Sequence, residues 1–142
     1  MFKDLFLAAL CAFGIQAHAQ DVVTYPFEGD FEDATFAVEN AIVGQGLNID
    51  YVSHVGDMLN RTAADVGGTK QIFVAADIYL FCSAVLSRKV MEADPLNLVN
   101  CPYSIFAFED AGGVQVGHRT YPDGPMKKVQ ALLNDIVQEV LE

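Results

Sequence analysis

The sequence has no tryptophan and few positive charges. Its 142 residues include 8 Lys and Arg against 19 Asp and Glu, which gives a formal net charge of −11 at pH 7. Nucleic acids and anionic membranes are bound through basic surfaces, because the phosphate groups of both carry negative charge. The charge balance therefore argues against either as a partner, and it is compatible with metal cations or a basic protein.

Long hydrophobic runs are also scarce. The one notable apolar stretch, residues 5–15, is too short to cross a bilayer as a helix. It follows Lys3 and precedes Ala17-His18-Ala19, a small-x-small pattern typical of signal-peptide cleavage. We expect residues 1–19 to be a signal peptide cleaved after Ala19, and the mature protein to be periplasmic or secreted without a membrane span.

Cysteine is rare, and several catalytic motifs are missing. The chain has three cysteines, of which Cys11 lies in the predicted signal peptide, so Cys82 and Cys101 are expected to remain. There is no C-x-x-C, no H-E-x-x-H, no phosphate-binding loop and no recognisable Ser-His-Asp arrangement. These absences favour a small binding or accessory protein over an enzyme.

Residues 20–142 are predicted to form one domain in which strands and helices alternate. The predicted strands cover residues 22–27, 47–55, 71–81, 102–108 and 114–119, and the predicted helices cover 31–43, 57–65, 82–93 and 126–140. The order β-α-β-(α)-β-(α)-β-β-α indicates an α+β fold, with an antiparallel sheet and the first and last helices on one face. An exposed edge of such a sheet is compatible with a homodimer.

Strand polarity predicts which polar residues meet. If the last four strands form an antiparallel meander, the end of the third strand, the start of the fourth and the end of the fifth share one edge of the sheet. Cys82, Cys101 and His118 occupy these three positions, and His54 lies at the opposite edge. We therefore expect the Cα atoms of Cys82 and Cys101 to lie within the about 7 Å that a disulfide allows.

The segment FCSAVLSRKVMEADPLNLVNCPYSIFAF, residues 81–108, resembles the DUF302 family, a domain of unknown function. The similarity runs from Thr24 to about Tyr121. The resemblance implies a β-α-β(4)-α fold like that of the TATA-binding protein, with the helices on one face of the sheet. The family has no agreed activity, so the resemblance marks Cys82 and Cys101 as positions of interest without giving them a role.

Three interpretations of the cysteine pair remain open. A disulfide would close a loop of roughly 20 residues and stabilise the fold by about 3 kcal/mol. A site for a metal, haem or small ligand would use Cys82 and Cys101, with His118 as a third metal ligand and with Tyr103 and Arg119 supporting it; such a set suits copper or zinc. A thiol–disulfide redox pair would gain from a helix N-terminus at Cys82, which favours the thiolate.

Overall fold

A computed structural model describes residues 21–142, so the predicted signal peptide and its cleavage site lie outside the described part. The strands are β1 (Val22–Pro26), β2 (Ile49–Ser53), β3 (Ala75–Phe81), β4 (Tyr103–Asp110) and β5 (Gly113–Arg119). The helices are α1 (Phe31–Gly44), α2 (Val55–Thr62), α3 (Ala84–Ala93), the 3-10 helix η1 (Pro95–Asn100) and α4 (Lys127–Val140).

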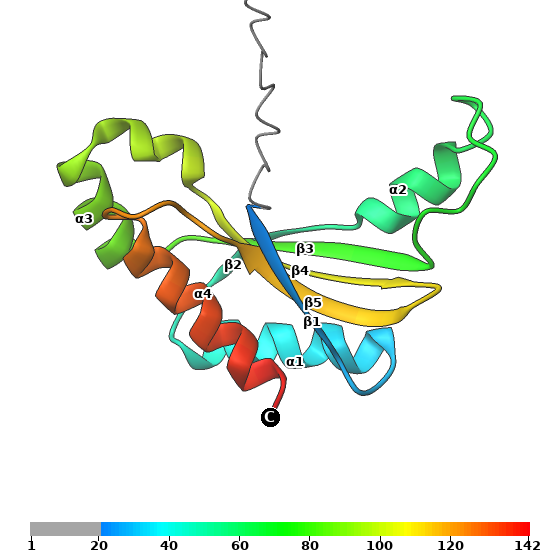
Figure 1. Cartoon of the computed structure of the whole chain (residues 1–142), viewed down its shortest axis with the longest axis horizontal. Helices are drawn as coiled ribbons and strands as arrows, with labels where there is room; N and C mark the ends of the chain where they lie inside the picture. The colour runs from blue at the N-terminus through cyan, green and yellow to red at the C-terminus, as the bar shows by residue number, and fades with distance from the viewer. Residues whose placement is uncertain (1–20) are drawn as a thin grey trace, which may run out of the picture.

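The strands form one five-stranded sheet in the order β1-β5-β4-β3-β2, and every neighbouring pair is antiparallel. Strands β2 to β5 follow one another as a meander, and β1 lies beside β5 at the edge (Figure 1). The predicted α+β fold with an antiparallel sheet is confirmed.

The turn between β4 and β5 is tighter than the sequence suggested. A loop was predicted over residues 109–113, but the strands continue to Asp110 and resume at Gly113, which pair with each other. The Asp110 carboxylate accepts a hydrogen bond from the Gly112 N–H at 2.7 Å, and Gly113 has a φ of 108°, which a glycine adopts without strain. The hairpin expected between these two strands is therefore present, and its loop is shorter than residues 109–113.

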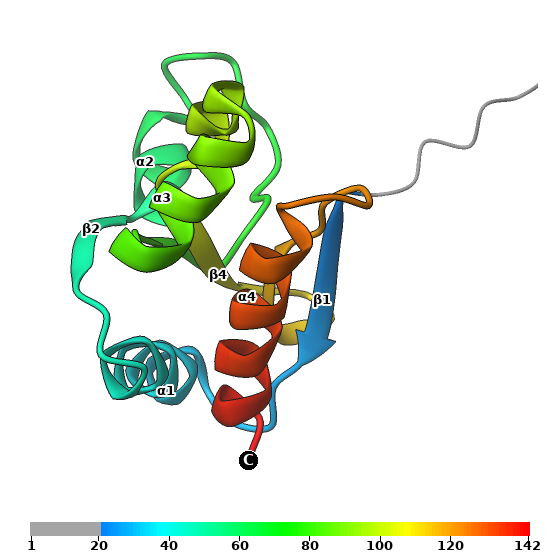
Figure 2. The ribbon, with the colours of Figure 1, turned by 90° about the vertical axis from the view of Figure 1, so that its left-hand side faces the viewer.

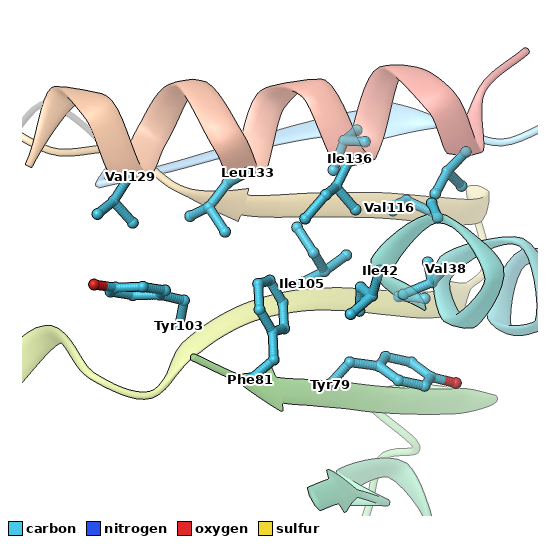
Figure 3. Packing of buried hydrophobic residues seen from close by; sticks show 14 of the residues in the cluster. Val38, Ile42, Tyr79, Phe81, Tyr103, Ile105, Val116, Val129, Leu133 and Ile136 are labelled. Atoms are coloured by element: carbon cyan, nitrogen blue, oxygen red, sulfur yellow. The ribbon is translucent and has the colours of Figure 1, made fainter. Parts of the chain in front are cut away.

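The hydrophobic core lies between the sheet and the helices α1 and α4, which pack side by side on one face (Figures 1 and 2). Figure 3 shows side chains from both helices meeting side chains of β3, β4 and β5. The fully buried members include Val38, Ile42, Tyr79, Phe81, Ile105, Val116, Val129, Leu133 and Ile136. Each such side chain contributes roughly 1.5–3 kcal/mol of transfer free energy, so this layer is the main stabilising element.

The other helices lie toward the ends of the sheet: α2 toward one end, α3 with η1 toward the other (Figure 1). Phe106 and Phe108 alternate with the buried residues Ile105 and Ala107 and so lie on the face away from α1 and α4. Their rings are 6.3 Å apart, and the ring of Phe73 lies 5.4 Å from that of Phe108. Within residues 21–142, no helix combines the length and apolar character that crossing a bilayer requires.

Candidate functional site: two thiols and three hydroxyls

The strand registers bring the two cysteines to one end of the sheet. Phe81 pairs with Tyr103, so Cys82 follows the end of β3 at the point where Cys101 leads into β4. His118 pairs with Ile105 near the end of β5 and belongs to the same end of the sheet. The backbone between the cysteines leaves through α3 and returns through η1, and the Cys101–Pro102 peptide is cis.

Both thiols are free and half-buried, and they lie near enough for Cys101 to act on the pKa of Cys82. Burial raises the pKa of Cys82 to about 12, and the hydrogen bond and charge of Cys101 act in the same direction. The charge of Asp50 adds a smaller contribution, while the backbone of Tyr103 opposes it. Cys82 therefore keeps its proton at neutral pH.

This protonated state corrects the expectation of a thiolate at a helix N-terminus. Helix α3 begins at Ala84, and its cap is Ser83, whose hydroxyl accepts a hydrogen bond from the Leu86 N–H at 3.3 Å. Cys82 lies one residue before the cap. At this position burial and the neighbouring thiol outweigh the helix dipole, which acts mainly on groups in contact with the first turn.

Hydroxyl groups surround the thiol pair. The Ser87 hydroxyl lies 3.0 Å from the Tyr103 hydroxyl and 3.8 Å from the Cys101 sulfur. Burial raises the pKa of Tyr103, and the charges of Cys101 and Cys82 also raise it, while the hydrogen bond from Ser87 lowers it. Burial likewise raises the pKa of Tyr121, which also interacts electrostatically with Tyr103 and Cys101. We call Cys82, Cys101, Ser87, Tyr103 and Tyr121 the thiol–hydroxyl cluster.

The two residues predicted to support the site, Tyr103 and Arg119, have different relations to this cluster. Tyr103 is one of its members and is fully buried. Arg119 is exposed at the end of β5 and acts on the cluster through Tyr121, whose pKa its positive charge lowers. Arg119 therefore contributes charge at the border of the site.

His118 is turned away from the thiols. It follows the buried Val116 by two residues along β5, so its ring lies on the same face, which α4 covers, and it lines a cavity of about 360 Å³ between β1 and α4. Its Nδ1 lies 2.7 Å from the Arg119 carbonyl and donates to it, because a carbonyl only accepts. Its Nε2 is buried without a hydrogen-bond partner, and burial lowers the pKa of the ring.

The three predicted metal ligands are therefore not assembled. Among residues 21–142, no three His, Cys, Asp or Glu side chains gather closely enough to hold a metal ion. The reason is where the three residues lie. Cys82 and Cys101 lie just beyond the ends of their strands, whereas His118 lies within β5 and its side chain is buried on the core face. The Cys82–Cys101 pair remains as the candidate site, without His118.

Three groups near the thiols were not anticipated. Ser87 follows the cap residue Ser83 by four positions, and this spacing, which places both on one face of a helix, was a usable signal. Tyr121 and Asp50 gave no such signal, because they come from segments that only the tertiary fold brings near Cys101 and Cys82.

At the opposite end of the sheet, His54 forms an ion pair with Asp77 at 2.7 Å. The sequence suggested only a solvated strand end at His54. Asp77 lies in the middle of the apolar strand β3, and its side chain is only 14% exposed. A carboxylate in such a strand requires a partner, so the sequence did contain a signal for this pair.

Comparison with known proteins finds a family match and a similar solved structure. The sequence matches the family described as "Domain of unknown function DUF302" over residues 23–141. None of the curated proteins matches the chain. A solved structure, an uncharacterized conserved protein DUF302 from Bacillus stearothermophilus, is 14% identical with a TM-score of 0.61, covering 86% of this chain and 94% of that chain. At this identity the likeness shows the shared fold.

Proposed function

The chain belongs to the DUF302 family, and we propose that this member is a dithiol protein whose Cys82 and Cys101 form and open a disulfide by exchange with a partner. The observation that supports the proposal is a pair of free, half-buried thiols that the pairing of Phe81 with Tyr103 brings to one end of the sheet. We also propose export to an oxidising compartment, as the predicted signal peptide suggests; disulfides form and persist in such compartments.

The proposed exchange has a defined order. The Cys101 thiolate attacks the disulfide of the partner, one partner sulfur leaves as a thiolate, and a mixed disulfide forms. Cys82 then gives up its proton and attacks the Cys101 sulfur, which releases the second partner thiolate. The two cysteines lose two electrons, the partner disulfide gains them, and the two protons end on the partner's thiols.

The pKa of Cys82 supports this order. At rest, burial raises it first, and the hydrogen bond and charge of Cys101 raise it further. Once Cys101 is bonded to the partner, its negative charge is gone and its contribution to the pKa disappears. Cys82 therefore becomes easier to ionise at the step where its thiolate is needed.

A redox titration tests the proposal. The full chain is exported to a bacterial periplasm, intact mass verifies a start at Gln20, and the reduced protein is equilibrated with glutathione buffers before alkylation. We expect an intramolecular disulfide that opens and closes between roughly −180 and −270 mV, as in thiol oxidoreductases. A bond that stays closed below about −300 mV would be a structural disulfide, and it would refute the exchange role.

The two cysteine variants provide matched controls. Cys82→Ser retains the attacking thiol and lacks the resolving one, so we expect it to accumulate the mixed disulfide with glutathione. Cys101→Ser retains only the buried, protonated thiol and should react much more slowly. Equal reaction of both variants would show that the assigned order is wrong.

Capture of a soft cation is a second candidate. The charge of Asp50 acts on Cys82, so a carboxylate lies near the thiols and would help to hold a bound cation. Thiolates select soft ions such as Cu(I). The reduced protein should then bind one equivalent of Cu(I) and lose both titratable thiols, and Asp50→Asn should weaken this binding. Unchanged thiol reactivity in the presence of Cu(I) would exclude the candidate.

A further inference from the structure

Positive charge gathers around the thiol–hydroxyl cluster, although the protein is strongly acidic. Of the eight Lys and Arg residues, Lys3 lies outside the described residues, and Arg61 and Lys70 lie in and after α2. The remaining five belong to α3, the end of β5 and the start of α4: Arg88, Lys89, Arg119, Lys127 and Lys128. Of these, Arg88 pairs with Glu92 on the same helix at 2.9 Å, so the positive charge of this region comes from the other four. The start of α4 lies beside α3 (Figures 1 and 2).

Two of these lysines converge from different helices. The neighbouring Lys89 on α3 lowers the pKa of Lys128 on α4, so the two like charges lie near each other. Helix α3 is also the element whose Ser87 contacts Cys101. Like charges that converge in this way favour an anionic partner, because a carboxylate placed between them relieves their repulsion.

An apolar strip borders the same thiols. It consists of Val85 on α3 and Leu96, Leu98 and Val99 on η1, which are 78%, 74%, 63% and 80% exposed. The strip and the thiols lie on neighbouring stretches of backbone, since the Cys101 N–H donates to the Leu98 carbonyl at 3.1 Å and Val85 follows Cys82 by three residues. No residue of η1 is charged. Exposed apolar residues gathered in this way mark an interaction surface.

We infer that α3, η1 and the start of α4 form a docking surface for an acidic polypeptide segment whose reactive disulfide is flanked by apolar side chains. This inference rests on the proposed thiol exchange and names its partner class. The apolar strip would cover the apolar side chains of the segment, and Lys89, Lys128 and Arg119 would pair with its carboxylates. Charge complementarity selects this occupant, because the positive residues of an otherwise acidic protein are concentrated here.

Synthetic peptides of equal length test the inference. Each carries one cysteine in a mixed disulfide with 2-mercaptoethanol. The residues flanking this cysteine are Glu and Leu in the first peptide (Glu–Leu), Lys and Leu in the second (Lys–Leu), and Glu and Ser in the third (Glu–Ser). Bis(2-hydroxyethyl) disulfide serves as a small neutral reference. We expect the reduced protein to react with the Glu–Leu peptide at least about tenfold faster than with the Lys–Leu peptide at low salt, and the difference to shrink at high salt.

Paired variants separate the two parts of the surface. K89E/K128E should abolish the preference for Glu over Lys, and L96S/V99S should abolish the preference for Leu over Ser. R61E/K70E and F36S/V43S alter exposed charges and apolar side chains elsewhere, and both should leave the preferences unchanged. Circular dichroism of each variant checks that the fold is retained.

The outcomes distinguish this inference from the proposed function. If the reference disulfide reacts and the three peptides do not differ, the docking surface is refuted while the thiol exchange stands. If no disulfide reacts, the exchange and the docking surface both fall. If sedimentation shows a dimer that L96S/V99S dissociates, a second copy of this chain covers the strip, and the acidic partner is overturned.

Discussion

The Nε2 atom of His118 is buried without a hydrogen-bond partner. Its Nδ1–H donates to the Arg119 carbonyl, so in the neutral ring the proton is on Nδ1 and Nε2 carries none. A proton at Nε2 would place a positive charge on a side chain that is only 1% exposed, at an atom without a hydrogen-bond partner. The fold therefore holds this histidine in its neutral form.

The sign of the resulting pH dependence follows from the lowered pKa of His118. In the unfolded chain the imidazole takes up a proton near its ordinary value of 6.5, whereas in the folded protein it does so only at lower pH. The unfolded state thus binds more protons below pH 6.5, and stability falls as the pH falls. We expect His118→Gln to lose less stability than the parent between about pH 7 and about pH 5, measured by urea unfolding.

His54 is a second histidine among the described residues, and its Nδ1 lies 2.7 Å from the Asp77 carboxylate. The comparison is therefore made in a His54→Gln background, where only His118 differs between the two proteins. An identical loss of stability with and without His118 would show that its burial does not shift its titration.

The cysteine site was only partly predictable at the scale of residues. Strand polarity was sufficient to bring Cys82 and Cys101 to one end of the sheet. The protonation state of Cys82 was not predictable, because it depends on burial and on the sulfur of Cys101, which only the folded chain brings into contact. For the same reason, the sequence could not show that the ring of His118 turns toward the core.

Helix α3 is the element that carries the site. Its first turn is held by the Ser83 hydroxyl, which accepts from the Leu86 N–H, and its next turn presents Ser87 to Cys101 and Tyr103. We expect Ser83→Ala to lower the free energy of unfolding by about 1 kcal/mol, because the first turn loses its only side-chain cap. Urea unfolding of Ser83→Ala beside Ser104→Ala, which removes a hydroxyl from a strand, measures this. Equal midpoints would contradict the role of the cap.

The helices differed in how well the sequence predicted them. The predicted helices 31–43 and 126–140 are present as α1 and α4; the Asp30 side chain caps α1 by accepting from the Asp33 N–H at 2.9 Å, and one apolar side of α4 is buried. No element was predicted over residues 95–100, but they form η1, with the Asp94 carboxylate accepting from the Leu96 N–H. A 3-10 helix of this length has too few residues to show a hydrophobic period, so this element could not be predicted.

At the scale of the whole molecule, the net charge of −11 opposes folding. Five of the basic residues lie in α3, at the end of β5 and at the start of α4, near the two cysteines. The rest of the surface therefore has a higher density of negative charge than the net charge of −11 alone suggests. Because salt screens this repulsion, we expect the urea midpoint to rise between about 20 mM and about 200 mM NaCl. Lys127→Glu, which adds negative charge, should show a larger rise. If the urea midpoint instead falls as salt is added, attraction between opposite charges on the surface outweighs the repulsion between like charges.

The overall architecture was largely predictable. The alternation of strands and helices, together with the rule that consecutive strands pair, predicted the β2-to-β5 meander and the single helical layer on one face. The position of β1 was not predicted from the residues, because the partner of the first strand lies far along the chain. Gly117 would have been an indirect signal: a Cβ there would meet the Val23 carbonyl and come within 2.7 Å of Phe106, so the position needs a glycine.

The pairing of β1 with β5 determines how early during synthesis the sheet can be completed and how fast it can fold. Val22 is among the first described residues to be synthesised, yet its partner Arg119 emerges almost a whole domain later. The hairpins of β3, β4 and β5 close over short distances, whereas the β1–β5 ladder closes nearly the full length of the chain and must overcome the largest loop entropy. The native sheet therefore cannot be completed before nearly the whole chain has been synthesised, and the first strand waits longest for its partner.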